Sequence, residues 1–242
     1  MKTFCFTVDD NIRFFREINE KKYDSIFDHP YLAVYKRLHE RFGLKVQLNL
    51  FYQENAFNLS QFTNKYYNEF EGVADWLKLS FHSKMENVRP YEFSNYDEVY
   101  KDCYSVNEQI VRFASPKALA KTTTIHFCLA TKDGIQALSD NKIIGLLGLF
   151  GTNEKPRSSY LVNEDDAKKI RLGNGVKLGE ITYRGIDIVL NAFSKEEILS
   201  QLENLQNKNH INVMIHEQYF YSDYARYQKD FEEKLILTLS FF

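Results

Sequence analysis

The stretch that decides the fold is Lys2-Thr3-Phe4-Cys5-Phe6-Thr7-Val8-Asp9-Asp10. Its phenylalanines and valine alternate with Cys5 and Thr7, and this period of two is typical of a strand whose two faces differ. The strand ends in two neighbouring carboxylates, which repel each other and lose water when they are buried. Two explanations stay open for this pair. Aspartate can cap the helix that follows, or one carboxylate binds a metal while the other accepts a proton.

The composition is that of an ordinary globular chain. With 44% hydrophobic and 26% charged residues, 242 residues can build one barrel-sized domain or two small ones. The net charge of -2 argues against nucleic acid or an anionic membrane surface as a partner. No apolar run reaches the roughly 18–20 residues that a membrane span needs. The 16 tyrosines suit a carbohydrate surface, a packed core or a homo-oligomer interface.

The cysteines indicate the compartment. Cys5, Cys103 and Cys128 are odd in number, widely spaced and set in apolar runs, which is typical of thiols kept reduced. Asp9 and Asp10 interrupt the N-terminal apolar run too early for a signal peptide. We therefore expect a cytoplasmic protein.

Strand and helix patterns alternate along the chain, and this alternation favours an α/β fold with parallel strands covered by helices. The segment 151–179 is polar, with about one helical turn at 165–167. We expect further strands at 45–52, 76–81, 122–128, 143–150, 181–183, 186–190 and 211–215, and helices at 12–18, 30–42, 60–74, 95–113, 131–138, 194–205 and 223–239.

Titratable side chains follow four of the expected strands. Asp9-Asp10, His82, His126 and His216 each lie at or near a carboxyl end. Ligands of parallel α/β folds bind at that end of the strands. These side chains are therefore expected to meet at one mouth.

In this order, the motifs resemble those of the polysaccharide deacetylase family, carbohydrate esterase family 4. Thr7-Val8-Asp9-Asp10 is similar to the family's first motif, Thr-Phe-Asp-Asp, which implies Asp9 as the general base and Asp10 as a metal ligand. The resemblance also implies the fold: a distorted, TIM-like (β/α) barrel of seven strands, in a single domain over residues 1–242.

Two other motifs are matched in part. His82-Ser83-Lys84-Met85-Glu86 is similar to the motif His-Ser/Thr-x-x-His, which implies His82 as a ligand and puts Glu86 in place of the second histidine. Val213-Met214-Ile215-His216 is similar to the strand ending in Leu-x-His, which implies His216 as the catalytic acid. The Arg-Pro-Pro-Tyr motif is absent from its expected place at 124–127.

The third metal ligand stays open between two residues. Glu86 has the family's register, whereas His126 has a strand-end position and an imidazole, the commoner zinc ligand, and is slightly favoured. Candidate substrate contacts are Glu86, Tyr91, Glu217 and Tyr219. Each site residue also has a structural explanation, such as a solvated loop acid for Glu86 or a surface pair for His216 and Glu217.

The function that these expectations favour is hydrolysis of a carbon–nitrogen amide bond with a divalent metal such as zinc. The substrate would be an acetylated amino sugar, free, in an oligosaccharide or in a conjugate. The alternative is a non-catalytic, carbohydrate-binding barrel that lacks an intact set of metal ligands.

Overall fold

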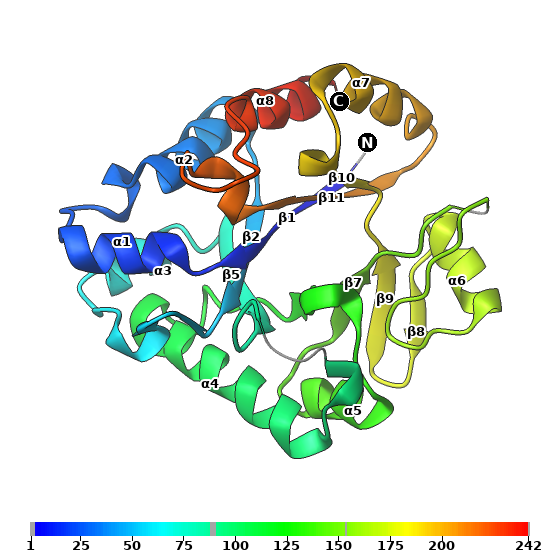
Figure 1. Cartoon of the computed structure of the whole chain (residues 1–242), viewed down its shortest axis with the longest axis horizontal. Helices are drawn as coiled ribbons and strands as arrows, with labels where there is room; N and C mark the ends of the chain where they lie inside the picture. The colour runs from blue at the N-terminus through cyan, green and yellow to red at the C-terminus, as the bar shows by residue number, and fades with distance from the viewer. Residues whose placement is uncertain (1–2, 88–90, 153, 242) are drawn as a thin grey trace.

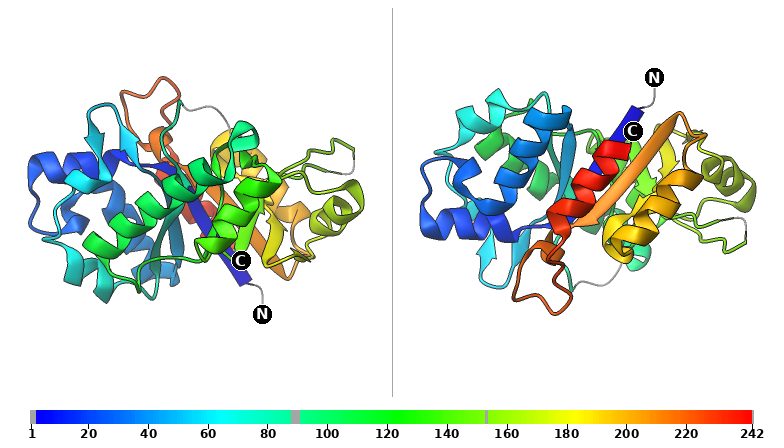
Figure 2. Two further views of the ribbon diagram at one scale, coloured as in Figure 1. Left: turned by 90° about the horizontal axis from the view of Figure 1, so that it is seen from below. Right: turned by 90° about the horizontal axis from the view of Figure 1, so that it is seen from above.

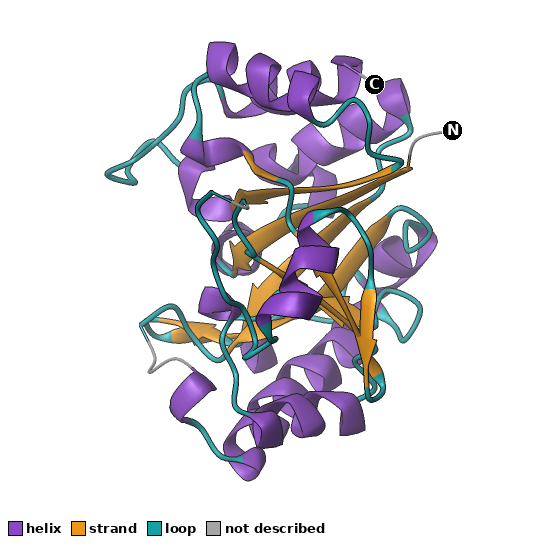
Figure 3. Cartoon of the chain, turned by 90° about the vertical axis from the view of Figure 1, so that its right-hand side faces the viewer, coloured by secondary structure: helices purple, strands orange, loops and turns teal. Residues whose placement is uncertain are grey.

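The computed structural model describes residues 3–87, 91–152 and 154–241. Its parallel strands lie at the centre, and the helices surround them on the outside (Figure 1). Figure 3 shows the same arrangement from the side, with the strands enclosed between groups of helices. The α/β class predicted from the alternating pattern is confirmed.

The N-terminal strand is the middle of a five-stranded parallel sheet. Strand β1 (Thr3–Asn11) pairs with β11 (His210–His216) on one side and with β2 (Val46–Phe51) on the other. Beyond them lie β5 (Leu77–Ser83), which pairs with β2, and β10 (Ile188–Val189), which pairs with β11. The order is β10-β11-β1-β2-β5.

A second sheet continues the curve. It has the order β6-β7-β9-β8, and β8 alone is antiparallel to its neighbour. A parallel bridge between Leu79 and Leu119 leads from β5 toward β6. The strands are β6 (Thr122–Thr123), β7 (Gly145–Gly148), β8 (Val176–Leu178) and β9 (Ile181–Gly185), and a small hairpin, β3 (Gln53–Glu54) and β4 (Phe57–Asn58), stands apart.

The two sheets form a distorted barrel, as expected, but no strand pairing joins β9 to β10 in the described part of the chain. The chain crosses at this point from one sheet to the other. The amide of Ile186 donates to Gly148 on β7, and the next amide, of Asp187, donates to Asn212 on β11. The distortion of the barrel is therefore an opening, because consecutive residues bond to different sheets.

Helices cover the outer faces of both sheets. In Figure 2, α7 and α8 lie side by side over the strands near the N-terminus. None of the helices in the described segments is long and apolar enough to cross a membrane. Their bounds are α1 (Arg13–Lys21), α2 (Pro30–Phe42), α3 (Tyr67–Gly72), α4 (Tyr96–Ala114), α5 (Lys132–Asp140), α6 (Glu164–Arg171), α7 (Lys195–Asn204) and α8 (Phe231–Phe241).

The helix ends follow the capping signals of the sequence. Asn95, Thr131 and Ser194 cap the N-termini of α4, α5 and α7, and Ser194 forms a capping box with Glu197. Gly43 ends α2 in the left-handed region with φ of 69°, a conformation that glycine adopts without a steric penalty. These sequence predictions are confirmed.

Three expected elements are wrong in extent. The helix expected at 60–74 is a short turn at Leu59–Gln61, held by the Asn58 cap, followed later by α3. The helix expected from 223 begins at Phe231, because Gln228 first ties the chain to Tyr219 and Asn191. Helix α6 is longer than the single turn expected.

A fourth expected element, the strand at 122–128, is also wrong in extent. Only Thr122–Thr123 pair as a strand, and the chain then turns with φ of 65° at Phe127 and 57° at Cys128. The β-branched residues of this segment favour a strand. Tertiary contacts override that preference, because the Ile125 amide donates to the Tyr160 hydroxyl and not to a neighbouring strand.

The end of β1 is held by one buried amide. Asn11 is fully buried, and its Nδ2 donates to the carbonyls of Val8 at 2.6 Å and Asn49 at 3.1 Å. Its Oδ1 accepts a hydrogen bond of 2.6 Å from the hydroxyl of Tyr31 on α2. Asn11 thus links β1, β2 and α2 directly beneath the two aspartates.

We expect Tyr31→Phe to lower the free energy of unfolding by ~1–2 kcal/mol, because Asn11 Oδ1 loses its donor in a buried setting. Tyr96→Phe is a matched control: it also deletes one hydroxyl donor, to Asp140 at 2.7 Å, but at an exposed pair. The control should cost less than about 0.5 kcal/mol. Urea unfolding measures both, and equal losses would contradict the role given to Asn11.

Candidate metal centre

The backbone of β1 turns Asp10 toward the mouth of the barrel. Strict alternation would place Asp9 and Asp10 on opposite faces of the strand. The register of β1 against β2 shifts between Val8 and Asn11, and Asp10 has φ of 64°, in the left-handed region. A bulge re-aims side chains in this way and is common beside functional sites.

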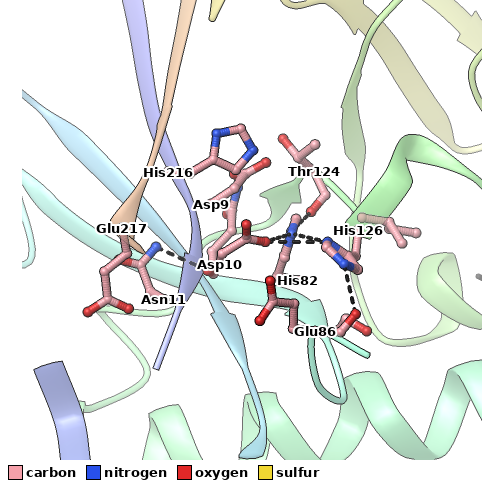
Figure 4. A network of polar contacts seen from close by, with 12 residues as sticks. Asp9, Asp10, Asn11, His82, Glu86, Thr124, His126, His216 and Glu217 are labelled. Carbon is pink, nitrogen blue, oxygen red and sulfur yellow. Dashed lines mark hydrogen bonds and ion pairs between the residues drawn. The ribbon is translucent and has the colours of Figure 1, made fainter. Parts of the chain in front are cut away.

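Asp10 meets two histidines, one from another strand and one from a turn (Figure 4). His82 Nε2 lies 3.0 Å and His126 Nδ1 lies 3.3 Å from Asp10 Oδ1, and the two nitrogens are 3.2 Å apart. His82 belongs to β5, whereas His126 follows β6. These ligand atoms lie within 4.8 Å of one another, as a shared metal ion requires.

The hydrogen bonds of the two imidazoles assign their protons. His82 Nδ1 contacts the carbonyl of Thr124, and His126 Nε2 lies 3.1 Å from the carbonyl of Glu86. A carbonyl only accepts, so each of these nitrogens carries the proton. In the neutral form of each ring, the other nitrogen therefore points a lone pair at Asp10 Oδ1.

The cluster consequently gathers three acceptor atoms at 3.0–3.3 Å with no donor between them. Such a group repels itself unless a proton or a cation lies inside it. Two imidazole nitrogens and a carboxylate oxygen are a donor set that zinc accepts. In metal-binding histidines, the ring nitrogen that does not face the metal usually donates a hydrogen bond to a carbonyl or carboxylate, as His82 Nδ1 and His126 Nε2 do here. The residues present thus fit a divalent metal.

The second oxygen of Asp10 is fixed separately. Gln218 Nε2 donates to Asp10 Oδ2 at 2.7 Å, which leaves Oδ1 to the histidines. Burial alone would raise the pKa of Asp10, but with a proton inside the cluster the hydrogen bonds from His126 and His82 lower it well below its usual value. Gln218 Oε1 is buried and has no hydrogen-bond partner among the described residues.

Asp9 lies beside this cluster in a drier setting. It is 1% exposed, and Asn49 Nδ2 donates to its Oδ1 at 2.7 Å. Burial raises the pKa of Asp9, although attraction by His82 and His216 opposes the shift. The two neighbouring carboxylates therefore have opposite pKa shifts, which is the pattern expected when each has its own role.

His216 is brought next to Asp9 by strand pairing. The two residues are register partners on β11 and β1, and Figure 4 shows the imidazole beside the carboxylate. Asn191 Oδ1 accepts the backbone amide of His216 at 3.2 Å and contacts His216 Nδ1 at 2.8 Å. Nδ1 therefore carries a proton, and Nε2 is left to exchange one.

Helix capping does not explain the two aspartates. The cap position of α1 is Ile12, and the amides of Ile12, Arg13 and Phe14 all donate to the carboxylate of Glu217, at 2.7, 3.1 and 2.8 Å. Glu217 supplies the negative charge that the start of this helix favours. The capping alternative for Asp9 and Asp10 is therefore wrong.

Two of the four expected substrate contacts, Glu217 and Tyr91, are buried side chains. Glu217 is 1% exposed and is occupied by α1 and by the hydroxyl of Tyr221, so it is not a surface partner of His216. Tyr91 is buried, and its hydroxyl accepts from the Lys84 amide and donates to Asp102. Both side chains have partners within the protein, and Glu217 also lines the cavity at the mouth, so their role as substrate contacts stays a prediction.

The two other candidates lie near the mouth. Tyr219 is half-buried, with its ring centroid 6.2 Å from that of His216. Glu86 is exposed and lines a cavity of about 480 Å³ together with Asp10, Arg13, Glu54, Gln218 and Tyr224. This cavity reaches the candidate metal cluster through Asp10.

Sequence reasoning missed Asn49, Asn191 and Gln218, which orient Asp9, His216 and Asp10. For Asn49 a signal was present, since it alternates with apolar residues on a strand next to β1. Asn191 and Gln218 lie in irregular turns, where no period marks them.

The sequence matches no protein-family model and no curated protein. Solved structures match in fold. One is a family 4 acetyl xylan esterase from Clostridium thermocellum with bound cobalt, at TM-score 0.54 and 10% identity over 99% of this chain and 82% of that one. Another is a peptidoglycan N-acetylglucosamine deacetylase, at TM-score 0.54 and 10% identity over 98% and 80%.

Two further structures of similar fold differ in function from these enzymes. A carbohydrate esterase family 4 pseudoenzyme from Bacillus anthracis matches at TM-score 0.54 and 9% identity, and the chain spans 59% of its length and is itself covered to 99%. A 4-alpha-glucanotransferase from Thermococcus litoralis matches at TM-score 0.59 and 14% identity over 99% of this chain and 37% of that one. The resemblance to the esterase family is thus confirmed for the fold, and the fold carries more than one chemistry.

We expect Glu217→Ala to lower the free energy of unfolding by ~3 kcal/mol or more, because several buried donors lose a charged acceptor together. Glu86→Ala is the control, since both glutamates were candidate substrate contacts and only Glu86 is exposed. It should change stability by less than about 0.5 kcal/mol. Thermal and urea unfolding measure both. A stable Glu217→Ala protein would contradict the capping role.

Proposed function

We propose that this protein hydrolyses a carbon–nitrogen amide bond with a divalent metal, as an N-deacetylase of an acetylated amino sugar or its conjugate. The observation that carries the proposal is the meeting of Asp10, His82 and His126, whose three ligand atoms lie within 4.8 Å of one another. Of the two candidates for third ligand, His126 is the one whose side chain belongs to this cluster.

The metal in this proposal is zinc or a similar divalent ion, held by Asp10 Oδ1, His82 Nε2 and His126 Nδ1. When bound, it supplies Lewis acidity, which polarises a carbonyl and makes water more acidic. The cobalt described in the acetyl xylan esterase supports a divalent metal on this fold. Gln218, Thr124 and Glu86 keep the three ligands oriented through their hydrogen bonds.

Asp9 and His216 move the protons. Asp9 is the buried carboxylate with the raised pKa, which suits a general base that takes a proton from water. His216 donates from Nε2 to the departing nitrogen, because Asn191 holds its Nδ1. An amine leaves only when it is protonated, so a positioned acid is needed more for an amide than for an ester.

The substrate class rests on the cavity and on the fold. The cavity of about 480 Å³ is lined by polar groups and by Tyr224, and aromatic faces with hydroxyls suit sugar rings. The deacetylase of similar fold acts on N-acetylglucosamine in peptidoglycan, and the esterase acts on acetylated xylan. We extend acetylated carbohydrate, not the particular polymer, to this chain.

Domain and location belong to the same proposal. We propose one barrel domain over residues 1–242, as the solved structures of similar fold cover nearly the whole chain. The three cysteines are free, which agrees with a cytoplasmic, reducing compartment. The same proposal includes association of copies of this chain through tyrosine-rich surfaces.

The second candidate is a barrel that binds carbohydrate without catalysis. The observation that favours it is the fold likeness to a pseudoenzyme. Metal analysis of protein purified without chelator separates the two. Stoichiometric metal supports the hydrolase, and metal-free protein that still binds acetylated sugars supports the second candidate.

We expect His82→Ala and His126→Ala each to weaken Zn²⁺ affinity by more than ~10-fold, since each removes one of the proposed ligands. Glu86→Ala is the control and should leave the affinity unchanged, because the Glu86 carboxylate is not in the cluster. Calorimetric titration of chelator-treated protein measures this. If Glu86→Ala weakens binding and His126→Ala does not, the assigned ligand set is wrong.

We expect Asp9→Asn to lower kcat for acetate release from N-acetylated amino sugars by ~100-fold or more, with Zn²⁺ affinity unchanged, because the variant lacks the general base. Parallel assays with O-acetylated sugars show whether the enzyme prefers the amide. Full activity of Asp9→Asn would refute the assigned base, and a preference for the ester would refute the amide.

A further inference from the structure

A chain of side-chain amides links Asp9 to the second sheet. Asn49 Nδ2 donates to Asp9 Oδ1 at 2.7 Å, and Gln47 Nε2 donates to Asn49 Oδ1 at the same distance. Gln47 Nε2 also donates to the carbonyl of Thr122 at 2.9 Å, and Thr122 Oγ1 donates back to Gln47 Oε1 at 2.8 Å. These contacts run from β1 through β2 to β6.

The direction of every bond in this chain follows from one backbone group. The Thr122 carbonyl only accepts, so the Gln47 atom that faces it is the amide nitrogen. That nitrogen also faces Asn49, so the Asn49 atom toward Gln47 is Oδ1, and its Nδ2 faces Asp9. A flipped Gln47 amide would place its oxygen against both the Thr122 carbonyl and Asn49 Oδ1.

The chain is shielded from water. Asn49 and Asp9 are 0% and 1% exposed, and Gln47 is 8% exposed. In a dry interior, a wrongly oriented amide leaves donors and acceptors unpaired at a cost of roughly 1–3 kcal/mol each. The orientation set at Thr122 is therefore transmitted to Asp9 with little freedom.

We propose that Gln47 is a positioning residue for Asp9: it fixes the amide of Asn49, which holds Asp9 Oδ1 and leaves Oδ2 to take the proton from water. The geometry of the chain stands by itself, whereas its effect on turnover rests on the proposed function of Asp9. Gln47 touches neither the metal-binding cluster nor the cavity at the mouth.

Gln47→Met tests the role of the amide, because it keeps the length of the side chain and removes its donor and acceptor. Asn49 is then free to turn, and we expect kcat for acetate release to fall about 10-fold at unchanged KM and Zn²⁺ affinity, part of the general-base contribution. Gln47→Glu should be more severe, because its carboxylate attracts the Asn49 amide away from Asp9. If the buried charge prevents folding, Gln47→Met decides alone.

Ser80→Ala is the matched control. Ser80 Oγ donates to the same Thr122 carbonyl at 2.8 Å, and Ser80 is also buried on the neighbouring strand β5, but its hydroxyl makes no hydrogen bond to the Asn49 side chain. Its loss removes a bond to the same anchor without touching the amide chain. We expect kcat to stay within about 2-fold of the wild type.

A second readout does not need activity. In NMR spectra, the Asn49 side-chain amide, assigned by its disappearance in Asn49→Ser, should exchange slowly and move downfield through its bond to a carboxylate. Gln47→Met should shift it, and Ser80→Ala should not. An unshifted Asn49 signal in Gln47→Met overturns the proposal whatever the activity, and so does a shifted signal with unchanged kcat. An inactive wild type overturns only the proposed function, and the Asn49 signal then decides on the amide chain.

Discussion

The structure of the mouth depends on the repulsion among three acceptor atoms at Asp10, His82 and His126. Their backbone partners fix the outer nitrogens of both imidazoles, so the rings cannot turn away to relieve the repulsion. The chain also adopts left-handed backbone at Asp10 and at Phe127, next to His126. Such residues cost of order 1–3 kcal/mol each and persist only where their surroundings impose them. A protein that holds this arrangement for stability alone would accept two costs at once, strain and repulsion. A bound cation would offset the repulsion and would explain why the strained backbone is kept.

Buried polar side chains inside the barrel support the cluster at the mouth. Thr7 and Asp9 on β1, and Gln47 and Asn49 on β2, alternate with apolar residues that pack against the helices. The apolar face supplies the burial that stabilises the sheets, while the other face pairs its polar groups across the barrel. Thr122 belongs to the second sheet, whereas Gln47 and Ser80 belong to the first. Hydrogen bonds from these two side chains to the Thr122 carbonyl therefore join the two sheets inside the barrel, where strand pairing between them is incomplete. Polar contacts inside the barrel thus hold both its shape and the orientation of Asp9.

The sequence predicts the parts of this site that depend on short-range periodicity. A period of two identifies β1, and the rule that parallel strands carry ligands at their carboxyl ends brings Asp9-Asp10, His82 and His216 together. The parts that depend on distant contacts are not predictable in this way. The bulge at Asp10 has no signature in the local pattern, because glycine is absent there and strict alternation is broken by one residue. Glu217 follows His216 and reads as a surface acid, although it caps a helix more than 200 residues earlier in the chain. His126 was expected at the end of a strand, and it reaches the cluster from a turn that its β-branched neighbours disfavour.

The place of His126 also bears on how an incomplete motif can coexist with three converging candidate ligands. In the family's second motif, the position of Glu86 belongs to a histidine that binds the metal, and here its side chain is exposed. The same residue still contributes to the cluster, because its backbone carbonyl accepts from His126 Nε2 and so directs Nδ1 toward Asp10. A backbone carbonyl does this for any side chain, which removes the need for a particular residue at position 86. The second imidazole of the cluster comes instead from His126, which lies in the turn after β6. Since the fold also occurs in a pseudoenzyme, the fold alone does not separate a hydrolase from a barrel without catalysis.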